Sequence, residues 1–566
     1  MNTITRYAAA IALSAVVSGT ILPPFGEHGG WSLFPPLCAI SVAMITGRLV
    51  LGLCSALAAA AVIALPPGTG FVDGIIGVAR AATIGFVWKP LSESFQLYIL
   101  AFTVSLIGMV RILSVAGGTR GIAEALARTT EGKRAARLSA WLLGMSIFFD
   151  DYANTLVVGT TMRPVFDRFR ISREKLAYLV DSTAAPVAGI ALISTWIGFE
   201  VGLFEDAMQS VGTGVSGYEL FFLALPSRFY CLLALVFVGA SILLRRDFGP
   251  MLKAERRAST TGAVMRPGAK AMAGNEDRGL EIPAGVVADW RVAVAPVALV
   301  IIGVLAGMQH DAWNVADVVE ARQQDGFFSR SYWTTVFSNA DGARVMFQAA
   351  IAGSVLAFGL AVSRRAEDGH FPITPAIAAR AWVGGVTGFS GALIILVLAW
   401  AIKEACGAVG TSQYLVAALG DTLPAAALPV LVFLLASVVA FSIGTSWTTM
   451  ALLLPTTIPL AHTLGGMPIA VLVAAAVLDG AIFGDHCSPI SDTTVLSSVA
   501  SGCDHLDHVK TQSPYALVTM AVAAICGYVG TAIAWPAWIG LLTGIVVICG
   551  ILWLFGKDPD VQPNAV

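Results

Sequence analysis

Residues 138–167 read LSAWLLGMSIFFDDYANTLVVGTTMRPVFD, two apolar arms around a polar centre. Each arm, 138–149 and 156–167, holds 12 residues. As helix an arm reaches about 18 Å, too short to cross a hydrocarbon core of about 30 Å. Arginine and lysine flank both ends of the segment, and such residues stay on the cytoplasmic side. This predicts a re-entrant hairpin with its tip at 150–155; the alternative is one ordinary spanning helix.

The composition of the whole chain extends this prediction. Of its 566 residues 57% are hydrophobic and 12% are charged, and apolar runs of about 20 residues recur along it. Continuous runs favour helices over barrel strands, and we interpret the run at 7–22 as a retained helix rather than a signal peptide. We expect an all-α polytopic membrane protein with about 12 transmembrane helices and two re-entrant hairpins. The spans begin near Arg6, Ser32, Leu49, Phe95, Leu176, Glu219, Arg291, Arg344, Arg380, Met467, Pro514 and Pro536.

The distribution of charge predicts an orientation. Basic residues crowd 245–278 and recur at Arg364 and Arg365, whereas acidic residues dominate 200–206 and 311–341. Basic loops stay inside, so the first group should be cytoplasmic and the second should face outward. Counting spans places both termini in the cytoplasm of a bacterial inner membrane.

A second hairpin, 428–462, starts from the opposite face and has its predicted tip at 442–449. An offset of 292 sets Phe149 before the first tip over Phe441 before the second, and an offset of 303 sets Pro186 over Pro489. Two copies of opposite orientation form an inverted-topology repeat, which is typical of secondary transporters.

These assignments divide the chain into six parts. They are scaffold-like N-terminal helices 1–94; a first repeat 95–244 with hairpin 138–167 and broken helix 176–198; a cytoplasmic loop 245–290; connecting helices 291–377; a second repeat 378–534 with hairpin 428–462 and broken helix 467–500; and a C-terminal helix and tail 535–566.

Each hairpin is followed by a helix that polar residues and proline interrupt, at 181–186 and at 485–494. Proline removes a backbone donor and frees a carbonyl, which a membrane tolerates only where protein or water satisfies it. Oxygen-rich breaks suit hard cations such as sodium. The predicted ion-binding and proton-coupling residues are Asp150, Asp151, Asn154, Thr155, Asp181, Ser182, Thr183, Thr445, Ser446, Thr448, Asp485, His486, Ser488, Asp492 and Thr493.

Buried aspartates suggest the chemistry. An ionised, unpaired carboxylate in lipid costs several kcal/mol, and a carboxyl group holds a proton or a sodium ion but resists holding both. Such competition predicts exchange of Na⁺ for protons at the bilayer centre. His486 is either a proton carrier or an uncharged core histidine. The stretch 503–508 has the composition of a zinc cluster but lacks a second ligand pair. We expect no cofactor, no metal beyond transported Na⁺ and no nucleic-acid partner.

The motifs 149–155, 171–186 and 483–494, with 444–447 and Pro455, resemble the NhaC family of sodium/proton antiporters. The resemblance extends from about Trp31 to the last helices, with a longer loop at 245–289. It implies a mobile transport domain of hairpins and broken helices within the ion-transporter superfamily, a scaffold through which a homodimer can form, and transport rather than catalysis. It also supplies a rival, exchange of organic acids such as malate and lactate, which the lack of Lys or Arg at the tips disfavours.

Overall fold

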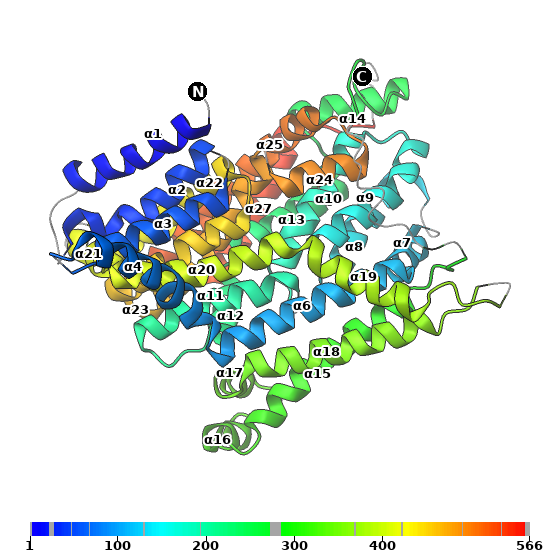
Figure 1. The fold of residues 1–566 in the computed structure, drawn as a ribbon. Helices are drawn as coiled ribbons and strands as arrows, with labels where there is room; N and C mark the ends of the chain where they lie inside the picture. The colour runs from blue at the N-terminus through cyan, green and yellow to red at the C-terminus, as the bar shows by residue number, and fades with distance from the viewer. Residues whose placement is uncertain are drawn as a thin grey trace.

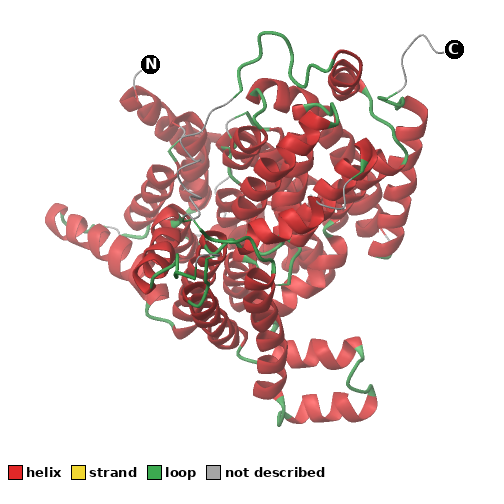
Figure 2. Ribbon diagram, turned by 90° about the vertical axis from the view of Figure 1, so that its right-hand side faces the viewer, coloured by secondary structure: helices red, strands yellow, loops and turns green. Residues whose placement is uncertain are grey.

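The computed structural model is a bundle of packed helices, drawn in red in Figure 2. It describes residues 3–21, 28–46, 48–66, 68–127, 131–192, 194–271, 283, 285–366, 369–419, 423–489, 491–533 and 535–560. Over these residues the elements are α-helices with short 3-10 and π-helical segments, and no strand is present. The all-α prediction is therefore confirmed.

Within these residues, eight helical segments are long and apolar enough to cross a membrane, and two bent pairs raise the number to ten. The chain is a polytopic membrane protein. The segments are Phe71–Leu91, Ser94–Val115, Arg291–Ala312, Gly342–Val362, Ala425–Ile443, Ser446–Cys487, His505–Ile533 and Ala537–Phe555, with the pairs Gly217–Ser227 + Phe229–Leu243 and Pro375–Gly388 + Leu393–Ala408.

The N-terminal helices differ from the expectation of full spans. Helix α1 (Thr3–Val16) continues into a π segment, Val17–Ile21, and a 3-10 segment, Gly29–Leu33, leads into α2 (Phe34–Thr46). Helix α3 (Leu49–Ile63) has 15 residues, or about 23 Å of helix. The apolar segments Gly29–Val42 and Val50–Ile63 are shorter than a full span. The twelve expected spans also omit Phe71–Leu91, in which α4 (Phe71–Arg80), a π segment and α5 (Lys89–Leu91) follow one another. Only 11% of this apolar segment is buried, so it presents apolar side chains to the surroundings.

The first repeat contains the predicted hairpin. Helix α6 (Ser94–Val115) and α7 (Gly118–Ala127) lead into α8 (Gly132–Ser146), which turns at 147–150 into α9 (Asp151–Arg168). Then come α10 (Arg173–Ala188), a break, α11 (Thr195–Val211), α12 (Gly217–Ala224), η4 (Leu225–Ser227) and α13 (Phe229–Leu243). The arms α8 and α9 have 15 and 18 residues, longer than the predicted 12. The tip is correspondingly shorter, because Asn154 and Thr155 already belong to the first turn of α9.

The second repeat is built in the same order. Helices α19 (Pro375–Gly388), α20 (Ser390–Ala408) and α21 (Thr411–Leu419) precede α22 (Leu428–Ile443), α23 (Ser446–Cys487) and α24 (Asp492–Ser501). The backbone of α23 is non-helical at Gly465 and Gly466, so α23 comprises both the second arm of the hairpin and the first part of the broken helix. Helices α25 (His505–Val522), α26 (Gly530–Ile533) and α27 (Ala537–Phe555) complete the chain.

The basic helix α14 (Gly249–Thr261) and the acidic helix α16 (Ala316–Gln324) lie at opposite ends of the molecule. Helix α14, α7 and the end of the chain lie toward the right of Figure 1, whereas α16, α17 (Arg330–Asn339) and α21 lie toward the left. Helices α15 (Arg291–Ala312) and α18 (Gly342–Val362) run side by side between these ends and pack against each other.

Two expectations about local structure are wrong. The first broken helix is continuous through Pro186, and its break lies at 189–194 instead of 181–186. Ser194 stabilises this position, since its hydroxyl donates to Ala188 O at 2.7 Å and accepts from the first amides of α11. The acidic stretch 200–206 is no outer loop: Glu200 and Asp206 are 0% and 1% exposed within α11. Glu200 is paired with the buried Arg228 and Asp206 with the partly exposed Lys403.

Candidate functional site

The first hairpin tip is fixed by one side chain, Asn154. Its amide nitrogen donates to three carbonyls, Gly144 O at 2.6 Å, Ile147 O at 3.0 Å and Thr183 O at 3.0 Å. The first two are the carbonyls that the end of α8 leaves without helical partners, and the third lies on α10. Asn154 is 0% exposed and its side-chain oxygen has no partner among the described residues. The residue therefore links α8, α9 and α10 and retains one buried oxygen.

The second hairpin tip is the short turn between α22 and α23. Gly444 adopts a left-handed conformation with φ +77°, which glycine accepts without steric cost. The next helix begins at Ser446, whose hydroxyl donates to Asp485 Oδ2 at 2.8 Å and also lies 3.1 Å from Ala481 O. The start of the second arm is thus joined to the carboxylate that precedes the second break.

In each half, the backbone carbonyl of the phenylalanine before the tip accepts a hydrogen bond from the edge or the inside of the break. Phe149 O, before the first tip, accepts from Thr195 N at 3.0 Å, where the helix resumes after the first break. Phe441 O, before the second tip, accepts from Ser488 Oγ at 2.7 Å, inside the second break. In each half the phenylalanine that precedes the tip therefore connects the hairpin to the gap in the broken helix.

Asp181 connects the two halves directly. Its carboxylate accepts from Thr494 Oγ1 at 3.2 Å, Ser497 Oγ at 3.1 Å and Gln512 Nε2 at 2.5 Å. Thr494 lies 3.1 Å from Asp485 O as well. A chain of buried polar groups thus runs from α10 through α24 to the second hairpin, and α24 packs against both α9 and α10.

The other predicted residues lie around this chain. Asp151, Thr155, Ser182, Thr183, Thr448, Ser488 and Thr493 are all buried. His486 is 1% exposed; its Nδ1 lies 3.0 Å from the Tyr230 hydroxyl, and its Nε2 has no partner among the described residues. Thr448 Oγ1 likewise has no described partner. The side chain of Asp492 lies outside the described residues.

A cavity of about 580 Å³ lies between the hairpin tips and the helices α6, α19 and α20. Asp150 and Tyr152 of the first tip and Thr445 and Trp447 of the second line one wall, and α6, α19 and α20 supply the other. Arg111 of α6 lies in that second wall. A cationic side chain therefore borders the tips, contrary to the expectation from the sequence.

The first break is closed by a residue that the sequence analysis missed, Arg228. Its Nη1 donates to Gly189 O at 2.7 Å, its Nε donates to Asp479 Oδ1 at 3.0 Å, and it is 1% exposed. Asp479 also accepts from Tyr230 N at 2.6 Å and from the Tyr528 hydroxyl at 2.7 Å. An arginine in a run as apolar as 220–243 was the available signal, because an ionised residue at such depth needs a partner.

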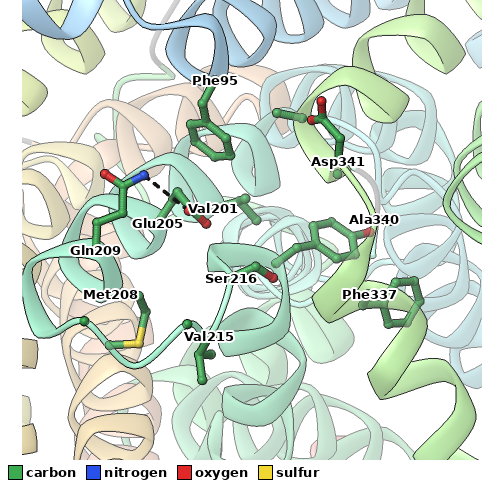
Figure 3. A pocket seen from close by; sticks show the side chains of 15 residues that line it. Phe95, Val201, Glu205, Met208, Gln209, Val215, Ser216, Phe337, Ala340 and Asp341 are labelled. Atoms are coloured by element: carbon green, nitrogen blue, oxygen red, sulfur yellow. Dashed lines mark hydrogen bonds between the residues drawn. The ribbon is translucent and has the colours of Figure 1, made fainter. Parts of the chain in front are cut away.

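A second cavity, of about 340 Å³, is separate from these residues. Figure 3 shows Phe95, Glu205, Met208 and Phe337 around it. It contains none of the predicted site residues, so we do not assign it to the ion pathway.

The zinc-like stretch 503–508 has other partners. Asp504 Oδ1 accepts from Leu506 N and Asp507 N at 3.1 and 3.2 Å, as the N-cap of α25. Backbone hydrogen bonds that include Lys270 N, with Arg266 nearby, outweigh partial burial and lower the pKa of Asp504. His508 Nε2 lies 2.8 Å from Gln512 Oε1. These residues cap and anchor α25.

The arrangement offers hard oxygen ligands from both halves. Carboxylates, hydroxyls, the Asn154 side-chain oxygen and the amino ends of α9, α23 and α24 lie at the two hairpin tips and the two breaks. Helix amino ends favour negative charge, and oxygen groups suit alkali cations. Such a site can bind a small cation beside a carboxyl group that also accepts a proton.

Known proteins resemble this chain in sequence and in fold. Residues 187–531 match the model of the Na+/H+ antiporter family. An uncharacterized protein of Haemophilus influenzae is 30% identical over 533 residues, which are 93% of this chain and 95% of the relative. The Alcanivorax borkumensis YdaH transporter has the same fold, with a TM-score of 0.52 at 15% identity over 89% of this chain and 99% of that one.

Shorter matches reach named antiporters. The Bacillus subtilis malate-2H(+)/Na(+)-lactate antiporter is 40% identical over 99 residues, 17% of this chain and 21% of its own length. The Halobacterium salinarum arginine/ornithine antiporter ArcD is 36% identical over 142 residues, 24% of this chain and 29% of its own length. The family model covers more than half of the sequence, and a relative that is 30% identical spans nearly all of it. The chain therefore belongs to the Na+/H+ antiporter family.

Proposed function

We propose that this secondary antiporter exchanges Na⁺ for protons at the carboxylates between its two hairpins. The observation that carries the proposal is the polar chain Asp181–Thr494–Asp485–Ser446, which joins the first half of the molecule to the second. Each carboxylate in it is 0 or 1% exposed. Buried carboxylates next to hydroxyl oxygens are suitable places for a proton and a sodium ion to compete.

Exchange follows from that competition. When a carboxyl group is protonated, a cation at the same oxygens loses its counter-charge, and when Na⁺ binds, the proton leaves. Alternating access moves the two hairpins and their broken helices against the scaffold, so that the same oxygens face each side in turn. More than one proton per Na⁺ would allow the membrane potential to drive export, at about 2.3 kcal/mol per charge per 100 mV.

The orientation is part of the proposal. The end of the molecule that holds the basic helix α14 faces the cytoplasm of a bacterial inner membrane, as do both termini, and the end that holds the acidic helix α16 faces outward. A homodimer through the exposed N-terminal helices is the proposed assembly. Transport of Na⁺ and protons needs no further cofactor.

One observation favours a second candidate function, exchange of an organic anion together with these ions. The 580 Å³ cavity has room for a small organic acid, and Arg111 provides a cation opposite the tips. The guanidinium group is well shaped for carboxylates. The malate/lactate antiporter of Bacillus subtilis is one of the shorter matches.

Proteoliposomes with an imposed pH gradient test both candidates. We expect Na⁺ alone to dissipate the gradient, and K⁺ to have little effect. Asp150→Asn, Asp151→Asn, Asp485→Asn and Asp492→Asn should each slow the exchange while leaving the protein in the membrane. A requirement for malate or lactate would favour the second candidate, and full activity in all four variants would contradict the site.

A further inference from the structure

The buried charges beside the first break do not balance. Arg228 lies among two carboxylates, with Nε 3.0 Å from Asp479 Oδ1 and Nη1 3.7 Å from Glu200 Oε1. The side chains of all three are at most 1% exposed. With every group ionised, this cluster carries one uncompensated negative charge.

The two carboxylates are bound very differently. Asp479 accepts hydrogen bonds from Arg228, Tyr230 N and Tyr528, at 2.6 to 3.0 Å. Neither oxygen of Glu200 has a hydrogen-bond partner among the described residues. Since an ionised carboxylate in an apolar interior without donors is very costly, the negative charge belongs on Asp479 and Glu200 is the group that must be neutralised.

Other charged groups near α11 do not supply that neutralisation. Lys403 of α20 and Gln96 of α6 bond Asp206, six positions further along α11, at 3.0 and 3.3 Å. Cys231 of α13 lies on the Arg228 guanidinium at 3.5 Å, and Tyr230 and Tyr528 face Asp479. Among the described residues, Arg228 is the one cation that forms an ion pair with Glu200.

We propose that Glu200 is a proton-binding site of the transport cycle, separate from the oxygens that hold Na⁺, and that it exchanges its proton as Arg228 moves between Asp479 and Glu200. This inference deepens the proposed function and rests on it. With Arg228 on Asp479, Glu200 is a neutral carboxylic acid. With Arg228 turned to Glu200, the carboxyl group ionises and its proton leaves to water through the open side of the carrier.

Arg228 is placed to connect this event to the ion site. The same guanidinium holds Gly189 O, at the end of the helix that carries Asp181. Tyr230, whose amide binds Asp479, has its hydroxyl 3.0 Å from His486, next to Asp485. A shift of the broken helices when Na⁺ binds therefore changes the environment of Arg228 through two direct contacts.

The test counts protons. The purified full-length protein is titrated with NaCl in two buffers of different ionisation enthalpy, and the difference in heat gives the protons released per Na⁺ bound. We expect Glu200→Gln to bind Na⁺ and to release one proton fewer than the wild type. Asp479→Asn should also release one proton fewer than the wild type. Arg228 then pairs with Glu200 alone and keeps it ionised before and after Na⁺ binds.

The matched control is Glu205→Gln, on the same helix, where the glutamate accepts from Gly217 N and lies away from Arg228. It should release as many protons as the wild type. Glu200→Gln with an unchanged proton count, or a loss in Glu205→Gln of the same size, would overturn the inference while leaving the proposed function intact. A wild type that binds Na⁺ without releasing any proton would instead overturn the proposed function.

Discussion

Buried charges at the centre of the molecule are arranged differently from those at its basic end. At the basic end the paired acids and cations are equal in number: Lys175 pairs with Asp247 at 2.7 Å and Arg257 with Glu174 at 2.9 Å. Arg137 and Lys133 together pair with Glu255 and Asp560. At the centre, Glu200 and Asp479 share Arg228, and Asp181 and Asp485 are bonded to neutral groups.

This difference separates charged groups that stabilise the structure from charged groups that can exchange ions. A matched pair has no reason to exchange its proton, since both partners are stable when ionised. A surplus of carboxylates must be neutralised by ions from outside, and in an antiporter these are the transported ions. We therefore propose that the excess of acids at the centre is the transport site, whereas the matched pairs hold the hairpin and loop at the basic end.

Removing the shared cation should have the largest effect on stability. Arg228→Met leaves Asp479 and Gly189 O without their charged donor, and breaking a buried ion pair costs about 3–5 kcal/mol. We expect a strong fall in folded yield and in the melting temperature in detergent, measured by size-exclusion chromatography and thermal unfolding. A melting temperature equal to that of the wild type within error would show that Arg228 does not stabilise the buried cluster.

Disrupting the contact between the two halves at Asp181 should cause the second-largest loss of stability. Asp181→Asn keeps the volume of the side chain but turns an acceptor into a donor that faces Thr494, Ser497 and Gln512. Buried donors without partners cost about 1–3 kcal/mol. Thermal unfolding should show an intermediate loss of stability, and Na⁺-driven proton flux should fall as well. Unchanged stability would show that Asp181 does not hold the two halves together and would leave ion binding as its role.

At the basic end, Asp560 is paired with Arg137 and Lys133, and its contribution to stability should depend on pH. Although burial opposes it, the charges of Arg137 and Lys133 lower the pKa of Asp560. The stabilisation is therefore present above the unfolded pKa of about 3.9 and is lost as the pH falls through the lower folded value. Asp560→Asn should cost about 1 kcal/mol at neutral pH, and the difference from the wild type should vanish in acid.

An exposed pair provides the smallest effect. Arg245 and Asp558 lie 3.3 Å apart with 49% and 28% of their side chains exposed. Arg245→Met should change stability by about 0.5 kcal/mol or less, since exposed pairs are weak. The same substitution at Arg228 and at Arg245 thus compares buried and exposed arginine directly in one unfolding assay.

Much of this arrangement was predictable from residue patterns. Short arms between like-charged ends predicted the hairpins, and the offset between Phe149 and Phe441 predicted the paired tips. The first break was wrongly predicted at 181–186, because a helix tolerates a proline where packing compensates for the lost hydrogen bond. The positions of Ser194 and Arg228 decide where the backbone opens.

The central cluster was harder to predict. Glu200 and Asp206 belong to an acidic stretch that resembles an outer loop, and only the three-dimensional structure brings Arg228 and Lys403 to them. Arg111 has the sequence position of an ordinary boundary residue, yet it lines the cavity at the tips. Contacts between helices distant in sequence leave no local pattern, so periodicity cannot reveal them.

Binding of radioactive sodium to the purified protein at two pH values tests the competition between Na⁺ and protons most directly. If buried carboxyl groups hold either ion, the dissociation constant for Na⁺ should rise by up to about tenfold for each unit by which the pH falls below their pKa. The same dissociation constant at about pH 6 and about pH 8, with full occupancy at both, would show that protons and sodium do not share these carboxylates.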